Sequence, residues 1–512
     1  MSVSETSVIA RFFLAIWSVL SDSWPDSAPG RLFGRIGRAI RGQVERSAVC
    51  RFVWREGALP RGWPYSLSCR FFTALINLPC ALVKWIYKVG RRLWDGSLAF
   101  GLVSGLGGAS FAFLGLFLLV MLCAPHELWN NLYGLMGALV LTVLFILGSA
   151  ARPRLRLELD RLGPYVTLYM GLVVYGLAGS MSTSMSVRFF AFHLTSFLLV
   201  LLTVSCVRKY EQLQLMVVLA VAGITVAALY GCYQGYVGVE IVPSQQDMIV
   251  NEGMPGRVYS FFDNPNNFAE LLAMFIPLDL ALLLNARGWR GRVLALFSLG
   301  VCGAAIGLTY GRASWLGLAL ALVVFLGLMN WRFIPLFIVL GLCAIPLLPQ
   351  TIYNRILTIG NTQDSSTRYR FSIYAATGDL LKHYWLRGVG LGSDVMQAVF
   401  RAYYPPMSNG AYPIHTHNNY LQMWVEAGLA GAVVYVAMLL HQLKNGVKSV
   451  FACTDRRVKA MLSAAVAGLC GIMLISVAEY TWFYPRNMFV FWFIFGIIGA
   501  GVKLSRTGAE QK

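Results

Sequence analysis

Residues 98–124 read LAFGLVSGLGGASFAFLGLFLLVMLCA, without a single charged side chain. Comparable apolar runs recur along the chain, for example from Val293 to Leu308. A soluble helix of such length would present polar side chains on the face toward water, and neither run does. Runs of this kind predict transmembrane helices. The chain is therefore expected to be an all-α polytopic membrane protein.

The remaining sequence extends this pattern to about twelve spans. Of 512 residues, 57% are hydrophobic and 13% are charged. One connection, residues 350–416 between the ninth and tenth spans, is much longer than the others, and 365–383 within it has the apolar spacing of an amphipathic helix. We therefore expect a binding loop or lid there. The candidate spans are 98–123, 131–150, 163–180, 188–206, 211–231, 266–285, 293–310, 313–329, 333–349, 418–441, 458–478 and 488–504.

The net charge of +19 indicates topology before it indicates a partner. The basic residues sit in short segments between apolar runs, as the positive-inside rule predicts, so nucleic acid is not an expected partner. With the N-terminus in the cytoplasm, 32 of the 42 Lys and Arg residues fall on that side. The other ten lie on the predicted outer side and need a separate explanation: Arg188, Arg257, Arg312, Arg355, Arg368, Arg370, Lys382, Arg387, Arg401 and Arg486.

Three regions follow from this topology. Residues 1–95 hold 14 of the Lys and Arg residues among apolar ones, which favours a cytoplasmic or interfacial region on an anionic leaflet, although a loosely ordered tail is an alternative. Asn77, Pro79, Lys84 and Lys88 argue against a span there. Residues 96–505 are expected to form the membrane domain, and 506–512 a cytoplasmic tail.

No cleavable signal peptide is evident. The ten cysteines include no CxxC pair, so neither a disulfide scaffold nor a zinc site is expected.

Three arginines on the predicted outer side stand in recognisable settings. Arg257 precedes the Asn264-Pro265-Asn266 turn, Arg312 lies in the sequence TYGRASWLG between two spans, and Arg370 precedes Tyr374 by four residues. Each has a plain structural interpretation as well: a capped helix start, a helix-end anchor and a solvated helix face. An anion-binding role is the alternative for all three, and Arg368 could replace Arg370 in it.

The sequence around the start of the tenth span reads His415-Thr-His417-Asn418-Asn-Tyr-Leu-Gln-Met-Trp-Val-Glu426-Ala-Gly428. Histidine has an unperturbed pKa of about 6.5 and can accept a proton at neutral pH, although a lone histidine at a helix start is often only an interfacial anchor. Asn418 or Asn419 could fix its tautomer. His415 is expected to be a neighbouring group.

Further along, Gly428 and Gly431 are expected to allow close helix packing. Glu426, inside the span, needs a partner such as Arg312 or a tyrosine. Glu479 could contact a ligand, with structural pairing as the alternative.

Together these motifs resemble the O-antigen ligase and polymerase superfamily of bacterial glycan transferases. The resemblance covers about residues 250–435, whereas residues 1–95 have no counterpart in it. It implies transfer of a saccharide from a polyprenyl-diphosphate donor to a hydroxyl of a lipid or glycan acceptor, at the outer face of the bacterial cytoplasmic membrane. His417 would be the base, Arg257, Arg312 and Arg370 would bind the diphosphate, and Asn266, Asn418, His415 and Glu479 would support them.

The implied reaction inverts the anomeric centre and needs neither a metal nor another cofactor, so activity should survive EDTA. Polymerisation, with a second lipid-linked repeat as acceptor, uses the same apparatus and remains open beside ligation. A transporter or flippase of an anionic lipid-linked solute would also suit many spans and intramembrane charge. A scaffold without catalysis is a third alternative.

Overall fold

The computed structural model describes residues 23, 26–48, 51, 54–242 and 253–510, and within these residues the only regular secondary structure is helical. The chain forms two compact units, residues 1–62 and 63–512. The first unit contains α3 (Ala28–Arg46) and α5 (Ala58–Gly62). α3 begins after Ser27, whose hydroxyl accepts a hydrogen bond from the Gly30 amide at 3.0 Å and so caps the helix.

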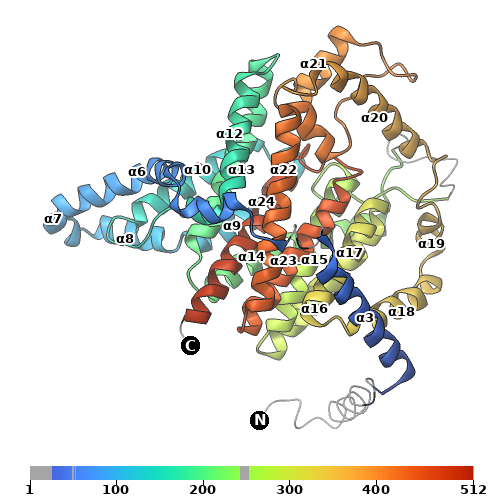
Figure 1. Cartoon of the computed structure of the whole chain (residues 1–512), viewed down its shortest axis with the longest axis horizontal. Helices are drawn as coiled ribbons and strands as arrows, with labels where there is room; N and C mark the ends of the chain where they lie inside the picture. The colour runs from blue at the N-terminus through green and yellow to red at the C-terminus, as the bar shows by residue number, and fades with distance from the viewer. Residues whose placement is uncertain (1–22, 24–25, 49–50, 52–53, 243–252, 511–512) are drawn as a thin grey trace. The chain divides into compact units, whose positions relative to one another are not determined.

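The second unit contains the apolar helices (Figure 1). Among the residues that the structure describes, ten helices are long and apolar enough to cross a membrane, or up to twelve if each of two bent pairs is one span. The expected all-α polytopic fold is thus confirmed. The main helices are α6 (Leu67–Val89), α7 (Arg91–Asp95), α8 (Leu98–Gly108), α9 (Ser110–Cys123), α10 (Asn131–Gly148), α11 (Leu159–Leu162), α12 (Pro164–Ala178), α13 (Thr183–Cys206), α14 (Tyr210–Val237), α15 (Pro265–Asn285), α16 (Trp289–Leu308), α17 (Arg312–Asn330), α18 (Phe333–Ala344), α19 (Gln350–Leu357), α20 (Ser365–Tyr384), α21 (Ser393–Tyr403), α22 (Asn419–Ala452), α23 (Arg456–Ile475) and α24 (Pro485–Glu510).

The spans differ from the expected set in three ways, the first of which is that α12, at the expected third span, has only 15 residues and is shorter than the candidate spans. The first expected span is a bent pair, α8 with α9 at 64°. The ninth ends where expected, and α19 follows it at 120° to the α18 segment. The helix α6 passes the length and hydropathy test for a span, which the sequence did not lead us to expect. Its polar residues nevertheless bind the segment between α10 and α11, because the Lys84 ammonium donates to the Leu155 carbonyl at 2.7 Å and the Asn77 amide to the Leu157 carbonyl at 2.9 Å.

Four helices form the interior of the second unit. Within the apolar stretches of α13, α15, α23 and α24, 72%, 78%, 78% and 72% of the residues are buried inside the protein, against 28% in α10, α16 and α17. The outer helices therefore retain apolar faces, which a bilayer would cover. Phe268, Phe275 and Phe489, on α15 and α24, are among the largest fully buried side chains.

The long segment between α18 and α22 is folded rather than irregular. It contains α19, α20 and α21, and α20 confirms the amphipathic helix expected over residues 365–383. Figure 1 shows α20 and α21 together at the edge of the second unit. Asp364 caps α20 by accepting hydrogen bonds from the Ser366 and Thr367 amides at 3.1 and 3.4 Å.

A break in α22 attaches this segment to the bundle. Gly428 has a φ of 67°, so the helix opens and exposes the carbonyls one turn earlier. The amides of Val389 and Gly390 donate to Val425 and Glu426 at 2.8 and 3.1 Å. A Cβ atom at Gly428 would lie 2.0 Å from the Leu386 carbonyl oxygen. The glycine thus accommodates a docked turn, which differs from the helix-helix packing expected for it.

Candidate functional site

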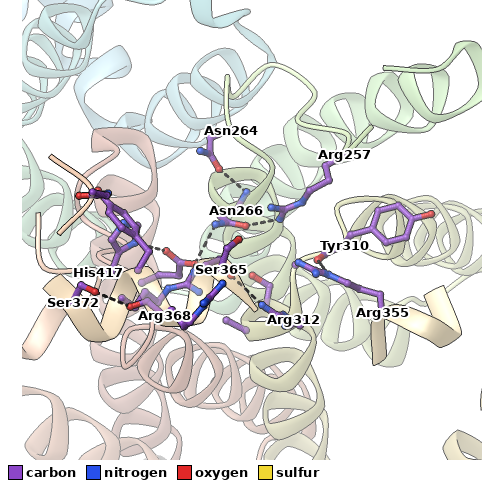
Figure 2. A pocket seen from close by; sticks show the side chains of 18 of the residues that line it. Arg257, Asn264, Asn266, Tyr310, Arg312, Arg355, Ser365, Arg368, Ser372 and His417 are labelled. Carbon is purple, nitrogen blue, oxygen red and sulfur yellow. Dashed lines mark hydrogen bonds and ion pairs between the residues drawn. The ribbon is translucent and has the colours of Figure 1, made fainter. Parts of the chain in front are cut away.

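A cavity of about 850 Å³ lies where α15 and α17 begin, facing α19, α20 and the start of α22. Figure 2 shows its side chains converging from these separate segments. One ionisable acid, Glu479, lines it, together with His417. The lining includes five arginines: Arg257, Arg312, Arg355, Arg368 and Arg370. A polar cavity with this cationic excess suits an anionic ligand.

Arg257 is held by two segments that are distant in sequence. Its Nε donates to the Thr309 carbonyl at 2.7 Å, and its Nη2 donates to Asn266 Oδ1 at 2.6 Å (Figure 2). Asn266 is positioned in turn by Asn264, whose side chain caps α15 by accepting from the Asn266 amide at 2.8 Å. The expected helix cap and the expected placement of Arg257 therefore occur together.

Asp364 joins two arginines at the other end of the cavity. Arg312 Nη2 lies 2.8 Å from its Oδ1, and Arg355 Nη1 lies 3.7 Å from its Oδ2. Arg312 also donates to the Thr358 carbonyl at 2.9 Å, which connects the start of α17 to the segment after α19. Arg312 thus pairs with Asp364 rather than with Glu426, which instead accepts from the Tyr480 hydroxyl at 3.2 Å.

Glu479 lies at the centre of the remaining contacts. Its Oε1 accepts from Asn266 Nδ2 at 3.1 Å and forms an ion pair with Arg370. Its Oε2 lies 3.2 Å from Nδ1 of His417. The carboxylate is thus surrounded by one guanidinium, one amide and one imidazole. Since an ionised carboxylate only accepts hydrogen bonds, the contact requires a proton on Nδ1 of His417, and in the neutral imidazole Nε2 is then the acceptor.

The backbone at His417 is in the left-handed region, with a φ of 48°. Such a conformation is uncommon for a residue other than glycine and persists when its surroundings enforce it. Tyr374 lies on α20, one helical turn after Arg370, and its hydroxyl donates to the His417 carbonyl at 3.2 Å. His415 Nδ1 accepts from the His417 amide at 3.2 Å, and the two rings are 4.2 Å apart.

The charges shift several pKa values. Burial, and then the neighbouring guanidinium of Arg355, lower the pKa of Arg257 to about 9. Burial alone would raise the pKa of Glu479, but Arg370 and then His417 outweigh it and hold that pKa at about 2. Burial, followed by His417, lowers the pKa of His415 to about 3. At neutral pH the site therefore contains an ionised Glu479, a neutral His415 and crowded guanidinium groups that an anion would stabilise.

Arg486, another of the ten cations, is completely buried and has a different environment. Its guanidinium donates to the carbonyls of Met121 and Phe261 at 3.1 and 3.2 Å and lies 5.1 Å from the centre of the Phe262 ring. These contacts fix the loop between Arg257 and α15. Arg486 therefore supports the site from outside the cavity.

The structure brings most of the expected residues together. His417, Arg257, Arg312, Arg370, Asn266 and Glu479 all line the one cavity. His415 and Asn418 are not among its lining residues. The His415 ring lies 4.2 Å from the His417 ring, tilted by 56°, and Asn418 caps α22 by accepting from the Leu421 amide at 3.0 Å. The expectation that Asn418 or Asn419 fixes the imidazole is wrong, because Glu479 contacts Nδ1 while the amide of Asn419 binds the Tyr435 hydroxyl.

Arg355 and Asp364 are participants that sequence reasoning did not assign to the site. Arg355 was among the cations on the predicted outer side, and this departure from the positive-inside rule was the signal that could have pointed to it. Asp364 precedes two serines at the start of a helix, so its sequence indicates only a cap.

Comparison with known families agrees with this arrangement. A family model described as O-antigen ligase matches residues 271–436, a range that includes Arg312, Arg370 and His417. No match was found among curated proteins. Residues 271–436 of this helical membrane protein thus match the O-antigen ligase family, which supports the resemblance to the O-antigen ligase and polymerase superfamily.

Proposed function

We propose that this membrane glycosyltransferase transfers a saccharide from a polyprenyl-diphosphate donor to an acceptor hydroxyl, without a metal and with inversion. The observation that carries the proposal is the five-arginine cavity with the His417–Glu479 pair in its wall. A diphosphate brings about two negative charges, and guanidinium groups bind phosphate oxygens in fork geometry. Arg257, Arg312 and Arg370 are the diphosphate-binding groups in this proposal, with Arg355 added to them.

These arginines would also assist bond cleavage. When the bond between the anomeric carbon and the diphosphate oxygen breaks, its electron pair stays on the departing diphosphate. Cations fixed in advance stabilise that growing charge more than they stabilise the bound donor. The arginine cluster is held by backbone carbonyls and by Asp364, so little reorganisation is needed.

His417 is the proposed base. Its Nε2 would take the proton of the acceptor hydroxyl while the hydroxyl oxygen forms a bond to the anomeric carbon. Glu479 would hold the imidazole tautomer and stabilise the imidazolium that results, and its own low pKa keeps it ionised throughout. In a single displacement the hydroxyl approaches opposite the diphosphate, which gives inversion.

We further propose that the cavity faces outward and that both chain termini are cytoplasmic. The basic segments 152–161 and 287–292, together with residues 1–95, would then share the cytoplasmic side. In this arrangement α6 lies along the membrane interface, with Lys84 bound to the segment after α10. Alkaline phosphatase fused after Thr362 should be active in cells, whereas a fusion after Arg154 should be inactive. The reverse pattern would refute this orientation.

The decisive experiment reconstitutes the purified protein in liposomes with a defined polyprenyl-diphosphate oligosaccharide and separate acceptors. We expect a glycosidic bond to form with the wild type, in the presence of EDTA, and to disappear with His417→Ala. A lipid-flipping assay run on the same liposomes tests the transporter alternative. Movement of labelled lipid without any glycosidic bond would overturn the proposed function, and unchanged transfer by His417→Ala would overturn the catalytic assignment.

A further inference from the structure

A second cavity, of about 550 Å³, lies among the N-terminal ends of α10, α13 and α24. None of the five arginines of the first cavity lines it. Phe189 and Phe192 are at least 91% buried in its wall, whereas Leu132 and Val187 are 55% and 53% exposed at its rim. The cavity is therefore apolar inside and also apolar along part of its edge.

The two cavities share a wall beside the proposed base. Phe483 lines the second cavity, and its ring centre is 4.5 Å from that of His415. The His415 ring is in turn 4.2 Å from that of His417, which lines the first cavity. Asp263 lines the second cavity and the next residue, Asn264, lines the first. A molecule in the second cavity would thus approach His417 from behind His415.

The ionisable side chains at the rim already contact one another or a neighbouring acid. Arg188 lies 2.6 Å from Asp394, and His126 lies 3.7 Å from Asp263. Arg188 is the one arginine among the lining residues that the structure describes. A diphosphate placed here would meet a single paired guanidinium, in contrast to the five arginines of the first cavity. Asn130 and Asn131 offer neutral hydrogen-bonding groups that suit sugar hydroxyls.

We propose that this second cavity binds the lipid portion of a glycolipid acceptor whose head group carries no diphosphate, and that it delivers the acceptor hydroxyl to His417. The inference rests on the proposed function and narrows it toward ligation, since a polymerase acceptor is itself linked to a diphosphate. Apolar contact with Phe189 and Phe192 would hold the chain of the acceptor, while its sugar would lie near the rim asparagines.

The test uses protein in lipid nanodiscs with one donor and three acceptors of the same sugar: a long-chain alkyl glycoside, the free sugar, and the polyprenyl-diphosphate-linked sugar. The wild type should use the alkyl glycoside with a kcat/KM at least tenfold above that of either other acceptor. Equal or better use of the diphosphate-linked acceptor would overturn the proposal.

A pair of variants on α10 tests the location. Leu135 lines the cavity, whereas Leu139, one turn later, is 39% exposed and lines neither cavity. Leu135→Trp should raise KM for the alkyl glycoside at least tenfold and leave donor KM unchanged, and Leu139→Trp should match the wild type. Equal KM values in the two variants would refute the site.

A photoreactive alkyl glycoside provides a readout without turnover. It should label segments containing Phe189 or Leu135, and Leu135→Trp should reduce the labelling several-fold. Labelling elsewhere would overturn the inference. Labelling at this cavity without formation of any glycosidic bond would instead place the failure in the proposed function, so the two failures are distinguishable.

Discussion

Replacement of Glu479 by glutamine tests the centre of the site with the smallest change in shape. The substitution keeps the volume and one carbonyl oxygen but removes the charge that pairs with Arg370 and contacts Nδ1 of His417. Loss of a charge-assisted hydrogen bond costs about 1.5–3 kcal/mol, so the protein should become less stable by about 2 kcal/mol while remaining folded. Breaking the pair also frees Arg370 to bind the donor.

The expected catalytic effect is larger than the effect on binding. Loss of a carboxylate that orients a catalytic histidine can reduce kcat by about 10⁴-fold, and we expect a loss of about 10²–10⁴-fold here. Donor KM should stay constant or fall.

The assay measures initial rates of glycosidic bond formation in liposomes, with thermal unfolding of each variant as the control for folding. Glu479→Gln, His417→Ala and the double variant form a cycle. If both residues act as one unit, the double variant should be no worse than His417→Ala alone. Additive losses, or wild-type kcat in Glu479→Gln, would refute the proposed coupling.

Four further outcomes follow. Arg312→Ala should raise donor KM about 10–150-fold, the equivalent of about 1.5–3 kcal/mol. Arg368 is exposed, so Arg368→Ala should change donor KM little, and equal increases in the two variants, measured by donor titration, would contradict the assignment. Gly428→Ala should lower the midpoint of thermal unfolding, because its φ is 67° and its Cβ would meet the Leu386 carbonyl at 2.0 Å, whereas Gly300→Ala, with no atom within 4 Å, should not. Glu479 has a depressed pKa, so its contribution to the stability of the folded protein should be complete above about pH 5 and be lost as the pH falls toward 2. Equal unfolding midpoints of the wild type and Glu479→Gln at pH 7 would contradict this contribution. Transfer measured in EDTA should equal transfer in added Mg²⁺, and a rate that Mg²⁺ restores would refute charge stabilisation by arginine alone.

Most helices and the motifs could be predicted from local sequence. An apolar run of about twenty residues has few alternatives to a helix in a bilayer, so most of the spans could be placed without a fold. The bend between α8 and α9 was not apparent, because the sequence is apolar on both sides of the break. The break before α19 coincides with the expected end of the ninth span, where polar residues begin. The span-like length of α6 was missed because its polar residues were weighed without the loop that binds them.

The sequence by itself determined an all-helical membrane protein, and its motifs resembled a family that a family-model match then confirmed, because apolar runs and motif spacings are properties of contiguous residues. It also nominated His417 and three arginines. Only the tertiary structure decided which groups touch: Glu479 meets His417 across 62 residues, and Asp364 meets Arg312 across 52. Partners this far apart are selected by the packing of whole helices and by the break at Gly428, which no local pattern specifies.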